Sequence, residues 1–264
     1  MEFSRELIRR SGYARAGFAA HYDDFRPQAP PLLTDALCRE ARIDRPTLVV
    51  DLGSGTGLSA RAWTGVAKDV VGVEPNPAMI AVARRRTREP NVEFVEAFAH
   101  DTGLEDNCAD VVTCSQSLHW MEPQPTFTEA ARILRVGGVF AAYDYDIVPV
   151  VDPEIEQAWD AYGARRRALR EREGIQGGSD RWPKDGHLHR LRASGCFHFC
   201  REFVVHAETV GGADDLLGLV RSLGLLVEFE DELRFDELEE VVRRVLGERT
   251  VPFVFGYRVR IGVK

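Results

Sequence analysis

Three glycines at alternate positions, Gly53, Gly55 and Gly57, follow a short apolar run that ends in the carboxylate of Asp51. Glycine adopts positive φ values and has no Cβ, so the main chain can turn here and a ligand can lie against it. Glu74 ends a second apolar run about 20 residues further on, where doubly wound α/β folds place a carboxylate against ribose hydroxyls. Together these residues predict a nucleoside-binding site.

The spacing and charge of this segment indicate which nucleoside binds. A dinucleotide fingerprint has the spacing G-x-G-x-x-G, which seats a pyrophosphate at a helix N-terminus. The segment here instead reads Asp-x-Gly-x-Gly-x-Gly. The carboxylate of Asp51 would repel phosphates, but it would attract a ligand that carries an ammonium and a sulfonium group. The pattern favours S-adenosylmethionine, with an NAD-dependent oxidoreductase as the less favoured alternative.

Further candidate residues follow the fourth apolar run. His119 and Trp120 come after this run, at the sheet edge where open α/β folds bind ligands. His119 could be a general base for a hydroxyl acceptor, because the ordinary pKa of histidine lies near working pH. Methyl transfer often requires only positioning, however, since a sulfonium is an activated donor. We interpret His119 first as a pocket residue, and the predicted acceptor wall is Gln116, His119, Trp120, Tyr143 and Tyr145.

A long charged helix predicted over 153–173 supplies another candidate group. Trp159, Tyr162 and Arg166 share one face of this helix. A run of arginines on a helix is usually a solvated face. Because Arg166 shares its face with two aromatic residues, it is a candidate, with Trp159 and Tyr162, for contact with an anionic substrate.

Cys196, His198 and Cys200 alternate along a predicted strand and would share one of its faces. They could form part of a zinc site, but the Cys-x-x-Cys spacing typical of such sites is absent. We therefore expect ordinary strand packing and no metal site.

Alternating apolar runs and helical segments must position all of these residues. Strands are predicted at 48–51, 70–74, 92–95, 110–114 and 139–145, and helices at 58–63, 77–86 and 127–134. This alternation predicts a parallel sheet with helices on both faces. After residue 147 it is interrupted by the helix over 153–173, a glycine-rich loop over 174–185 and a helix over 186–194. Strands at 197–206 and 252–263 follow, with helices near 213–223 and 231–247 between them.

The composition excludes several classes of protein. The 264 residues include 42 acidic and 34 basic ones, so the net charge of −8 provides no general attraction for nucleic acid. No apolar stretch approaches the roughly 20 residues of a membrane span, and the first residues lack the apolar run of a signal peptide. The five cysteines are scattered and expected to be reduced. We expect a cytoplasmic protein that binds neither nucleic acid nor membranes, and its oligomeric state cannot be read from the sequence.

Five segments resemble the class I S-adenosylmethionine-dependent methyltransferases of the type 11 group. They are Val49–Gly57, Val73–Met79, Ala99–Leu104, Asp110–Trp120 and Ile133–Phe140. Three further segments, Tyr22–Pro27, Gln116–Trp120 and Gly256–Arg260, resemble the small-molecule branch typified by trans-aconitate methyltransferase. The resemblance implies an α/β, Rossmann-like fold. Its sheet would be seven-stranded and mostly parallel with an antiparallel last strand, and a helical lid would be inserted.

The resemblance also implies roles for particular residues. Asp51 and the loop Gly53, Ser54, Gly55, Thr56 and Gly57 would hold the methionyl part of S-adenosylmethionine, and Glu74 would hold the ribose hydroxyls. The adenine slot would be lined by Pro75, Met79, Ala99 and His100, although the family usually has an acid at the position of His100. Ser115 and Gln116 would lie beside the methyl group, and Tyr22 and Arg26 would fold over the cofactor, with Arg26 near its carboxylate.

These inferences predict a methyltransferase that acts on a small molecule, either a carboxylic acid or a hydroxyl or amine of a secondary metabolite. The domain organisation would be a helical cap over 1–45, a cofactor-binding core over 46–147, a lid insertion over 148–196, and closing strands with a helical substrate cap over 197–264. The alternative is a protein of the same fold that binds the cofactor without methylating.

Overall fold

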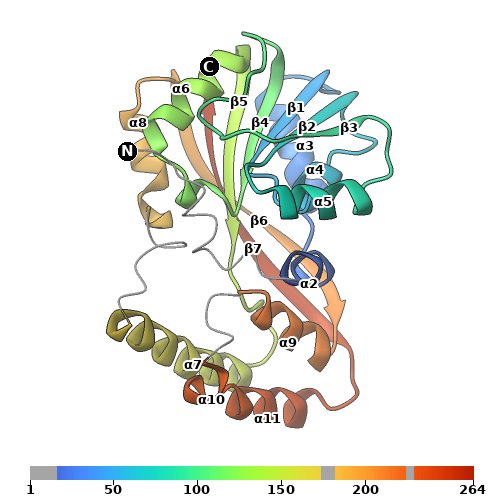
Figure 1. The fold of residues 1–264 in the computed structure, drawn as a ribbon, viewed down its shortest axis with the longest axis vertical. Coiled ribbons are helices and arrows are strands. Elements are labelled where there is room, and N and C mark those ends of the chain that lie inside the picture. The colour runs from blue at the N-terminus through green and yellow to red at the C-terminus, as the bar shows by residue number, and fades with distance from the viewer. Residues whose placement is uncertain (1–16, 174–181, 224–228) are drawn as a thin grey trace. The chain divides into compact units, whose positions relative to one another are not determined.

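The computed structural model describes residues 17–173, 182–223 and 229–264 (Figure 1). The chain divides into two compact units, each described by itself. The sheet unit comprises Pro27–Asp144, Gly178–Val205 and Arg258–Lys264. The helical unit comprises Met1–Arg26, Tyr145–Gly177 and His206–Tyr257.

The described part of the chain contains a seven-stranded sheet with the order β3-β2-β1-β4-β5-β7-β6. Its strands are β1 (Leu48–Leu52), β2 (Asp69–Val73), β3 (Val92–Val95), β4 (Ala109–Ser115), β5 (Leu134–Tyr145), β6 (Phe199–Gly211) and β7 (Val251–Val263). The first five strands pair in parallel. Strand β7 runs antiparallel to β5, since Gly137 donates to the carbonyl of Lys264 while Asp146 donates to that of Gly256. The predicted Rossmann-like fold, with its antiparallel last strand, is confirmed.

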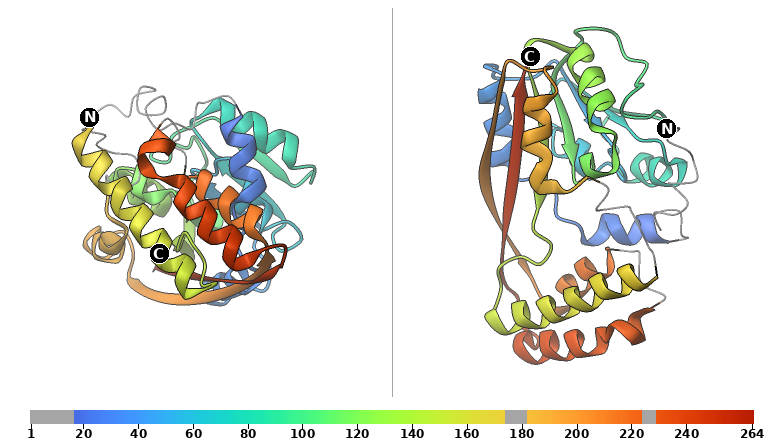
Figure 2. Two further views of the ribbon diagram at one scale, coloured as in Figure 1. Left: turned by 90° about the horizontal axis from the view of Figure 1, so that it is seen from below. Right: turned by 90° about the vertical axis from the view of Figure 1, so that its left-hand side faces the viewer.

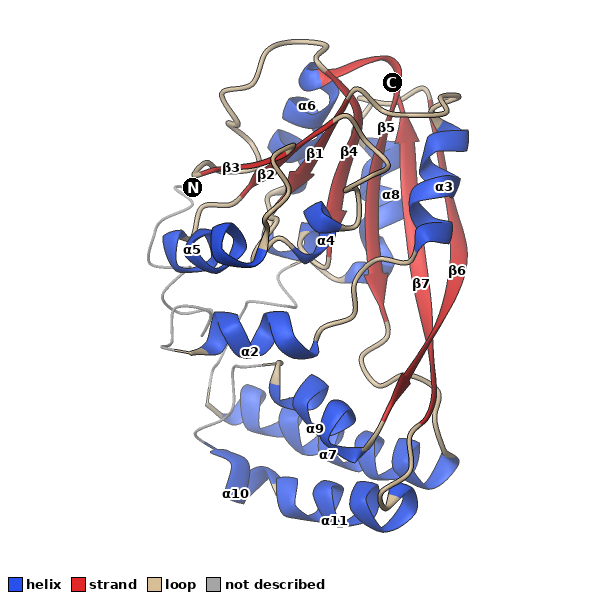
Figure 3. Cartoon of the chain, turned by 90° about the vertical axis from the view of Figure 1, so that its right-hand side faces the viewer, coloured by secondary structure: helices blue, strands red, loops and turns tan. Residues whose placement is uncertain are grey.

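Helices cover both faces of the sheet within the sheet unit. Figure 3 shows α3 (Pro31–Glu40), α4 (Leu58–Arg61) and α5 (Pro77–Arg86) in front of the sheet, with α6 (Pro123–Ile133) and α8 (His187–Ala193) behind it. Two short 3-10 helices, η1 (Leu118–Trp120) and η2 (Lys184–Gly186), complete the unit. Strands β1 and β4 are apolar and almost wholly buried, as expected for central parallel strands that are covered on both faces.

Local sequence explains where the principal helices begin. At α5, the side chain of Asn76 accepts a hydrogen bond from the amide of Ala78, and Pro77 occupies the first turn. At α7 (Pro153–Arg172), Asp152 accepts a hydrogen bond from the amide of Glu154 in the same way. Side-chain caps and a proline in the first turn both favour helix initiation at these points.

The helical unit contains α2 (Phe18–Phe25), α7, α9 (Ala213–Arg221), α10 (Glu230–Leu233) and α11 (Phe235–Leu246). Helices α7 and α11 lie side by side (Figure 2), joined by an edge-on contact between the rings of Tyr162 and Phe235. Helix α2 packs against α9 at Gly218, where a Cβ would lie 2.1 Å from the ring of Phe25. Glycine at 218 therefore allows the two helices to approach closely.

The observed element boundaries differ from the predicted ones at several points. The single helix predicted over 231–247 is two helices, because Arg234 adopts a left-handed conformation (φ 54°) that ends α10 before α11 begins. Strand β5 begins at Leu134 rather than at 139. Most of the glycine-rich loop predicted over 174–185 lies outside the described residues. Among the residues that are described, no helix is both long enough and apolar enough to cross a membrane.

The units also divide the chain at points other than the predicted segment boundaries. Helix α3 falls within the predicted cap over 1–45 and α8 within the predicted lid over 148–196, yet both belong to the sheet unit. Helix α7, from the same predicted lid, belongs to the helical unit.

Glu129 of α6 stabilises the sheet unit. Its carboxylate accepts hydrogen bonds from the amide of Thr102 at 2.9 Å and from the guanidinium of Arg132 at 2.7 Å. Burial alone would raise the pKa of Glu129, but the hydrogen bonds from Arg132 and Thr102 outweigh it and lower the pKa to about 2. A pKa below the unfolded value stabilises the fold above about pH 4.5, and this contribution is lost as the pH falls toward 2.

We expect Glu129→Gln to lower the free energy of unfolding by about 2 kcal/mol at neutral pH, because an amide cannot accept all of these hydrogen bonds. Urea unfolding followed by circular dichroism measures the change. The exposed Glu105 supplies the matched control, Glu105→Gln. The two variants should converge with the parent only near pH 2 and below, where the Glu129 carboxylate is protonated in the folded state as well. Equal stability of Glu129→Gln and Glu105→Gln at neutral pH would contradict the assignment.

Candidate functional site

The glycine loop connects β1 to α4 at the carboxyl end of β1. Gly53, Gly55 and Gly57 have φ values of 67°, 55° and 84°, which only glycine adopts readily. The amides of Gly53 and Ser54 both donate to the carbonyl of Val73 at the end of β2. The loop is thereby fixed to the neighbouring strand.

One aromatic ring occupies the space beneath this loop. A Cβ at Gly57 would lie 2.8 Å from the ring of Phe94 on β3, and a Cβ at Gly72 on β2 would lie 2.6 Å from the same ring. Phe94 is itself nearly buried. The ring therefore supports the loop only because two glycines leave room for it.

Asp51 is the last polar residue of β1 and is fully buried. Its Oδ1 accepts a hydrogen bond of 2.7 Å from the hydroxyl of Thr113 on β4, whereas no residue in the described part of the chain pairs with Oδ2. Burial, together with the neighbouring carboxylate of Glu74, raises the pKa of Asp51 to about 7 despite the hydrogen bonds that it accepts. A cation that approached Asp51 would favour its ionised form.

Glu74 follows β2 and links the glycine loop to the turn that precedes α5. Its carboxylate accepts hydrogen bonds from the amide of Gly55 at 3.0 Å and from that of Asn76 at 2.9 Å. Burial raises the pKa of Glu74 to about 7 despite these hydrogen bonds. The site thus holds two buried carboxyl groups beside a loop whose main chain is open at Gly55, where a Cβ would meet nothing within 4 Å.

These features fit a cationic nucleoside. The buried hydroxyls of Ser54 and Thr56 and the Oδ2 atom of Asp51 have no hydrogen-bond partner among the described residues, and buried polar atoms of this kind normally have one. The two acidic groups would repel a pyrophosphate and attract an ammonium or sulfonium ion. The glycine loop, its unpaired polar atoms and the two acidic groups therefore agree with S-adenosylmethionine.

The end of β4 forms the neighbouring part of the site. Gln116 follows Ser115 and adopts a left-handed conformation (φ 49°), which is rare for residues other than glycine. The backbone amide of Gln116 donates to the carbonyl of Tyr143. The hydroxyl of Ser117 donates to the carbonyl of Leu52 at 2.8 Å, which ties this turn to the end of β1. His119 in η1 is buried, and its ring is 5.7 Å from that of Trp120.

Comparison with known proteins agrees with this geometry. The family described as "Methyltransferase domain" matches residues 50–142, which contain Asp51, Glu74, Gln116 and His119. Residues 50–142 of the sheet unit therefore match a methyltransferase domain. The match is to the methyltransferase domain in general, and it does not show the narrower trans-aconitate methyltransferase branch.

Individual relatives cover part of this chain. A protein of Saccharomyces cerevisiae named as a probable S-adenosylmethionine-dependent methyltransferase is 29% identical over 58% of this chain and 55% of its own length. The demethylmenaquinone methyltransferase of Clavibacter sepedonicus is 34% identical over 43% of this chain and 46% of its own. The chain thus spans about half the length of these relatives. A solved structure from Anaeromyxobacter dehalogenans, inferred to be a type II methyltransferase, is 26% identical with a TM-score of 0.68, covering 90% of this chain and 98% of its own.

Other predicted site residues of the methyltransferase domain lie near the ends of the strands. Met79 in α5 and Ala99 after β3 are buried, and Pro75 is half-buried. The ring of His100 stacks on that of Phe98 with the centroids 5.6 Å apart. Tyr143, predicted for the acceptor wall, is fully buried, and its hydroxyl contacts that of Ser59 in α4.

The remaining predicted contacts belong to the helical unit, so the structure does not relate them to the methyltransferase domain. Arg26 is buried and donates to the Ser222 hydroxyl at 2.6 Å and to the Tyr145 hydroxyl at 3.1 Å. Its guanidinium also lies over the ring of Tyr22. A separate group follows one face of α7, where Trp159 stacks at an angle on Tyr162 and Arg166 covers the Tyr162 ring.

The cysteine and histidine residues considered for zinc lie on or beside β6. Cys196 and Cys200 are half-buried against the core and His198 is exposed. In the described residues, no group of three or more metal-ligating side chains could hold a metal ion.

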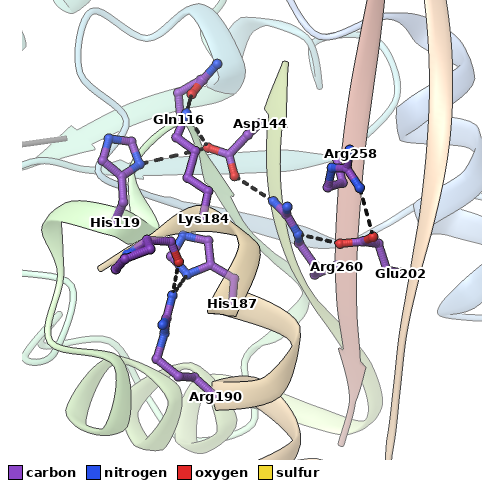
Figure 4. Close-up of polar contacts among 10 residues, drawn as sticks. Gln116, His119, Asp144, Lys184, His187, Arg190, Glu202, Arg258 and Arg260 are labelled. Carbon is purple, nitrogen blue, oxygen red and sulfur yellow. Dashed lines mark hydrogen bonds and ion pairs between the residues drawn. The ribbon is translucent and has the colours of Figure 1, made fainter. Parts of the chain in front are cut away.

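Sequence reasoning missed a charged cluster at the end of β5. Asp144 is nearly buried there and pairs with Lys184 of η2 and Arg260 of β7 (Figure 4). Glu202 of β6 pairs with Arg260 from the other side. The buried aspartate directly after Tyr143 was the available signal, since a carboxylate within an apolar strand normally requires a charged partner.

Proposed function

We propose that this chain is an S-adenosylmethionine-dependent methyltransferase whose acceptor is a small molecule. The observation that carries the proposal is the pair of buried carboxyl groups, Asp51 and Glu74. They lie beside the glycine loop, which leaves space for a ligand at Gly55. This pair lies inside the segment that matches the methyltransferase domain.

The residues of the domain have distinct tasks toward the cofactor. Asp51 and the glycine loop hold its methionyl part, and Glu74 accepts hydrogen bonds from its ribose hydroxyls. Pro75, Met79, Ala99 and His100 line the adenine slot. Ser115 and Gln116 lie beside the methyl group that S-adenosylmethionine supplies in activated form. By the resemblance alone, Tyr22 and Arg26 are further candidates for contact with the cofactor.

Toward the acceptor, the protein provides proximity and exclusion of water. Trp120 and Tyr145 form part of the wall, and the face of Trp159, Tyr162 and Arg166 contributes from the lid. His119 shapes this wall, and it acts as a general base where the acceptor must lose a proton. The proposed lid comprises the insertion over 148–196 and the helical cap over 208–247 between the closing strands. Acceptor classes consistent with these residues are a small carboxylic acid and a hydroxyl or amine, and the relative from Clavibacter sepedonicus is named for a small-molecule acceptor, demethylmenaquinone.

The proposal is tested by incubating the purified chain with S-adenosylmethionine and a fractionated metabolite extract. We expect release of S-adenosylhomocysteine, together with a product heavier than its precursor by one CH2 unit in the mass spectrum. Isotopically labelled methyl donor identifies that product by its mass shift. Tight binding of S-adenosylmethionine without any methylated product would favour a non-methylating binder, and absence of binding would refute the cofactor assignment.

A further inference from the structure

The charged cluster of the sheet unit has a buried interior, formed by Asp144 and Arg260, and more exposed members around it. Asp144 accepts a hydrogen bond of 2.7 Å from Arg260, and its other carboxylate oxygen is 3.0 Å from the Nζ atom of Lys184. The side chains of Asp144 and Arg260 are 10% and 3% exposed, whereas that of Lys184 is 33% exposed. Of the two cations that pair with Asp144, Lys184 is therefore the one that a ligand can reach.

The cluster holds more cations than carboxylates. Lys184 and Arg260 share the charge of Asp144, and Glu202 is paired at 3.3 Å with the exposed Arg258 as well as with Arg260. Burial lowers the pKa of the adjacent His187 to about 4, so this ring contributes no charge at neutral pH. The three cations Lys184, Arg258 and Arg260 therefore exceed the two carboxylates by one positive charge.

Lys184 also contacts the residue that the proposed function places beside the transferred methyl group. Its ammonium donates to the side-chain oxygen of Gln116, the residue that follows β4 in a left-handed conformation (Figure 4). An ammonium has three N–H donors. Among the described residues, Gln116 and Asp144 accept two of them, which leaves one donor for a bound molecule.

We propose that Lys184 anchors the acceptor by binding an anionic oxygen group, a carboxylate or a phosphate ester. The inference rests on the proposed function and narrows its substrate class to anions. A half-buried ammonium forms strong charge-assisted hydrogen bonds with such groups. An uncharged acceptor would cover the ammonium without matching its charge, which costs binding free energy. The anchored group need not be the atom that is methylated.

The test measures binding of matched probes in the presence of S-adenosylhomocysteine, so that no turnover occurs. The probes are small mono- and dicarboxylates, small phosphate monoesters, and the amide or alcohol counterpart of each. Isothermal titration calorimetry should show that one anionic class binds about 30-fold more tightly than its uncharged counterparts. The carboxylate and phosphate arms identify which group the acceptor carries.

Lys184→Gln should lower the affinity for the anionic probe by about 30-fold. Lys184→Arg should retain most of the parent's affinity because it keeps the charge. The matched control is Lys68→Gln, which alters an exposed lysine before β2. All three variants should bind S-adenosylhomocysteine like the parent, and their melting temperatures show that they fold. A purely structural lysine would change stability without changing the preference for anions.

Two results would overturn the inference. One is that no anion binds better than its uncharged counterpart, and the other is that Lys184→Gln binds anions as tightly as the parent. In both cases, retained binding of S-adenosylmethionine would leave the proposed function standing. Failure of the parent to bind S-adenosylmethionine would overturn the proposed function, and this inference with it.

Discussion

Glu74→Ala should weaken the binding of S-adenosylmethionine by about 100-fold, which corresponds to about 3 kcal/mol at two charge-assisted hydrogen bonds. The carboxylate is expected to accept hydrogen bonds from the ribose hydroxyls, and it already fixes the amides of Gly55 and Asn76. Alanine would remove both functions. Isothermal titration calorimetry with S-adenosylmethionine measures the loss.

The controls separate loss of recognition from loss of the fold. Glu93→Ala changes an exposed glutamate on β3 and should bind the cofactor normally. Glu74→Gln keeps the shape of the side chain and should show an intermediate affinity. Circular dichroism and melting temperature establish that each variant is folded. A folded Glu74→Ala protein that bound S-adenosylmethionine as tightly as the parent would contradict the cofactor assignment.

Cofactor affinity should rise steeply with pH between about 5.5 and 7.5. In the absence of ligand, burial raises the pKa values of Asp51 and Glu74 to about 7. A cationic ligand stabilises the ionised carboxylates, so binding releases protons and is favoured by higher pH. Each carboxylate that must ionise should contribute about a 20-fold increase in affinity over this range.

The stability of the ligand-free protein should show the opposite trend. The folded pKa values of Asp51 and Glu74 lie above their unfolded values of 3.8 and 4.5. The contribution of these two groups to the free energy of unfolding is therefore complete below about pH 4, and it is lost as the pH rises through 7. Melting temperature measured across this range, with and without S-adenosylmethionine, distinguishes the two trends.

The double variant Asp51→Asn, Glu74→Gln is the control for both pH profiles. It removes the two titrating groups but leaves the ionisation of the ligand unchanged. Its affinity should be low and nearly independent of pH over the same range. A parent profile as flat as that of the double variant would show that the carboxylates are already ionised before the ligand binds.

The sequence allowed the fold and the cofactor loop to be predicted because their signals are local. Gly53, Gly55 and Gly57 fall within one short turn, and the conformation of that turn requires glycine. The positions of Asp51 and Glu74 follow from the register of adjacent parallel strands. A reader of the sequence can therefore locate this loop without knowing any distant contact.

Other features depend on contacts between distant parts of the chain. Lys184 meets Gln116 and Asp144 only after η2 packs near the ends of β4 and β5. The sequence around Lys184 gave no sign of this. The break at Arg234 was missed for a different reason, since the helical periodicity continues through it while one residue adopts a left-handed conformation.

The ring of Phe94 beneath the glycine loop imposes a constraint on how the sequence can change. Any side chain at Gly57 or Gly72 would collide with that ring, while a smaller residue at 94 would leave a cavity under the loop. Phe94 and Gly72 should therefore vary together among related proteins, whereas the positive φ of Gly57 requires glycine there in any case. An engineer who wishes to reshape the cofactor site should pair a smaller residue at 94 with alanine at 72, and must also make room at Ser54, whose Oγ would lie 2.8 Å from the new Cβ.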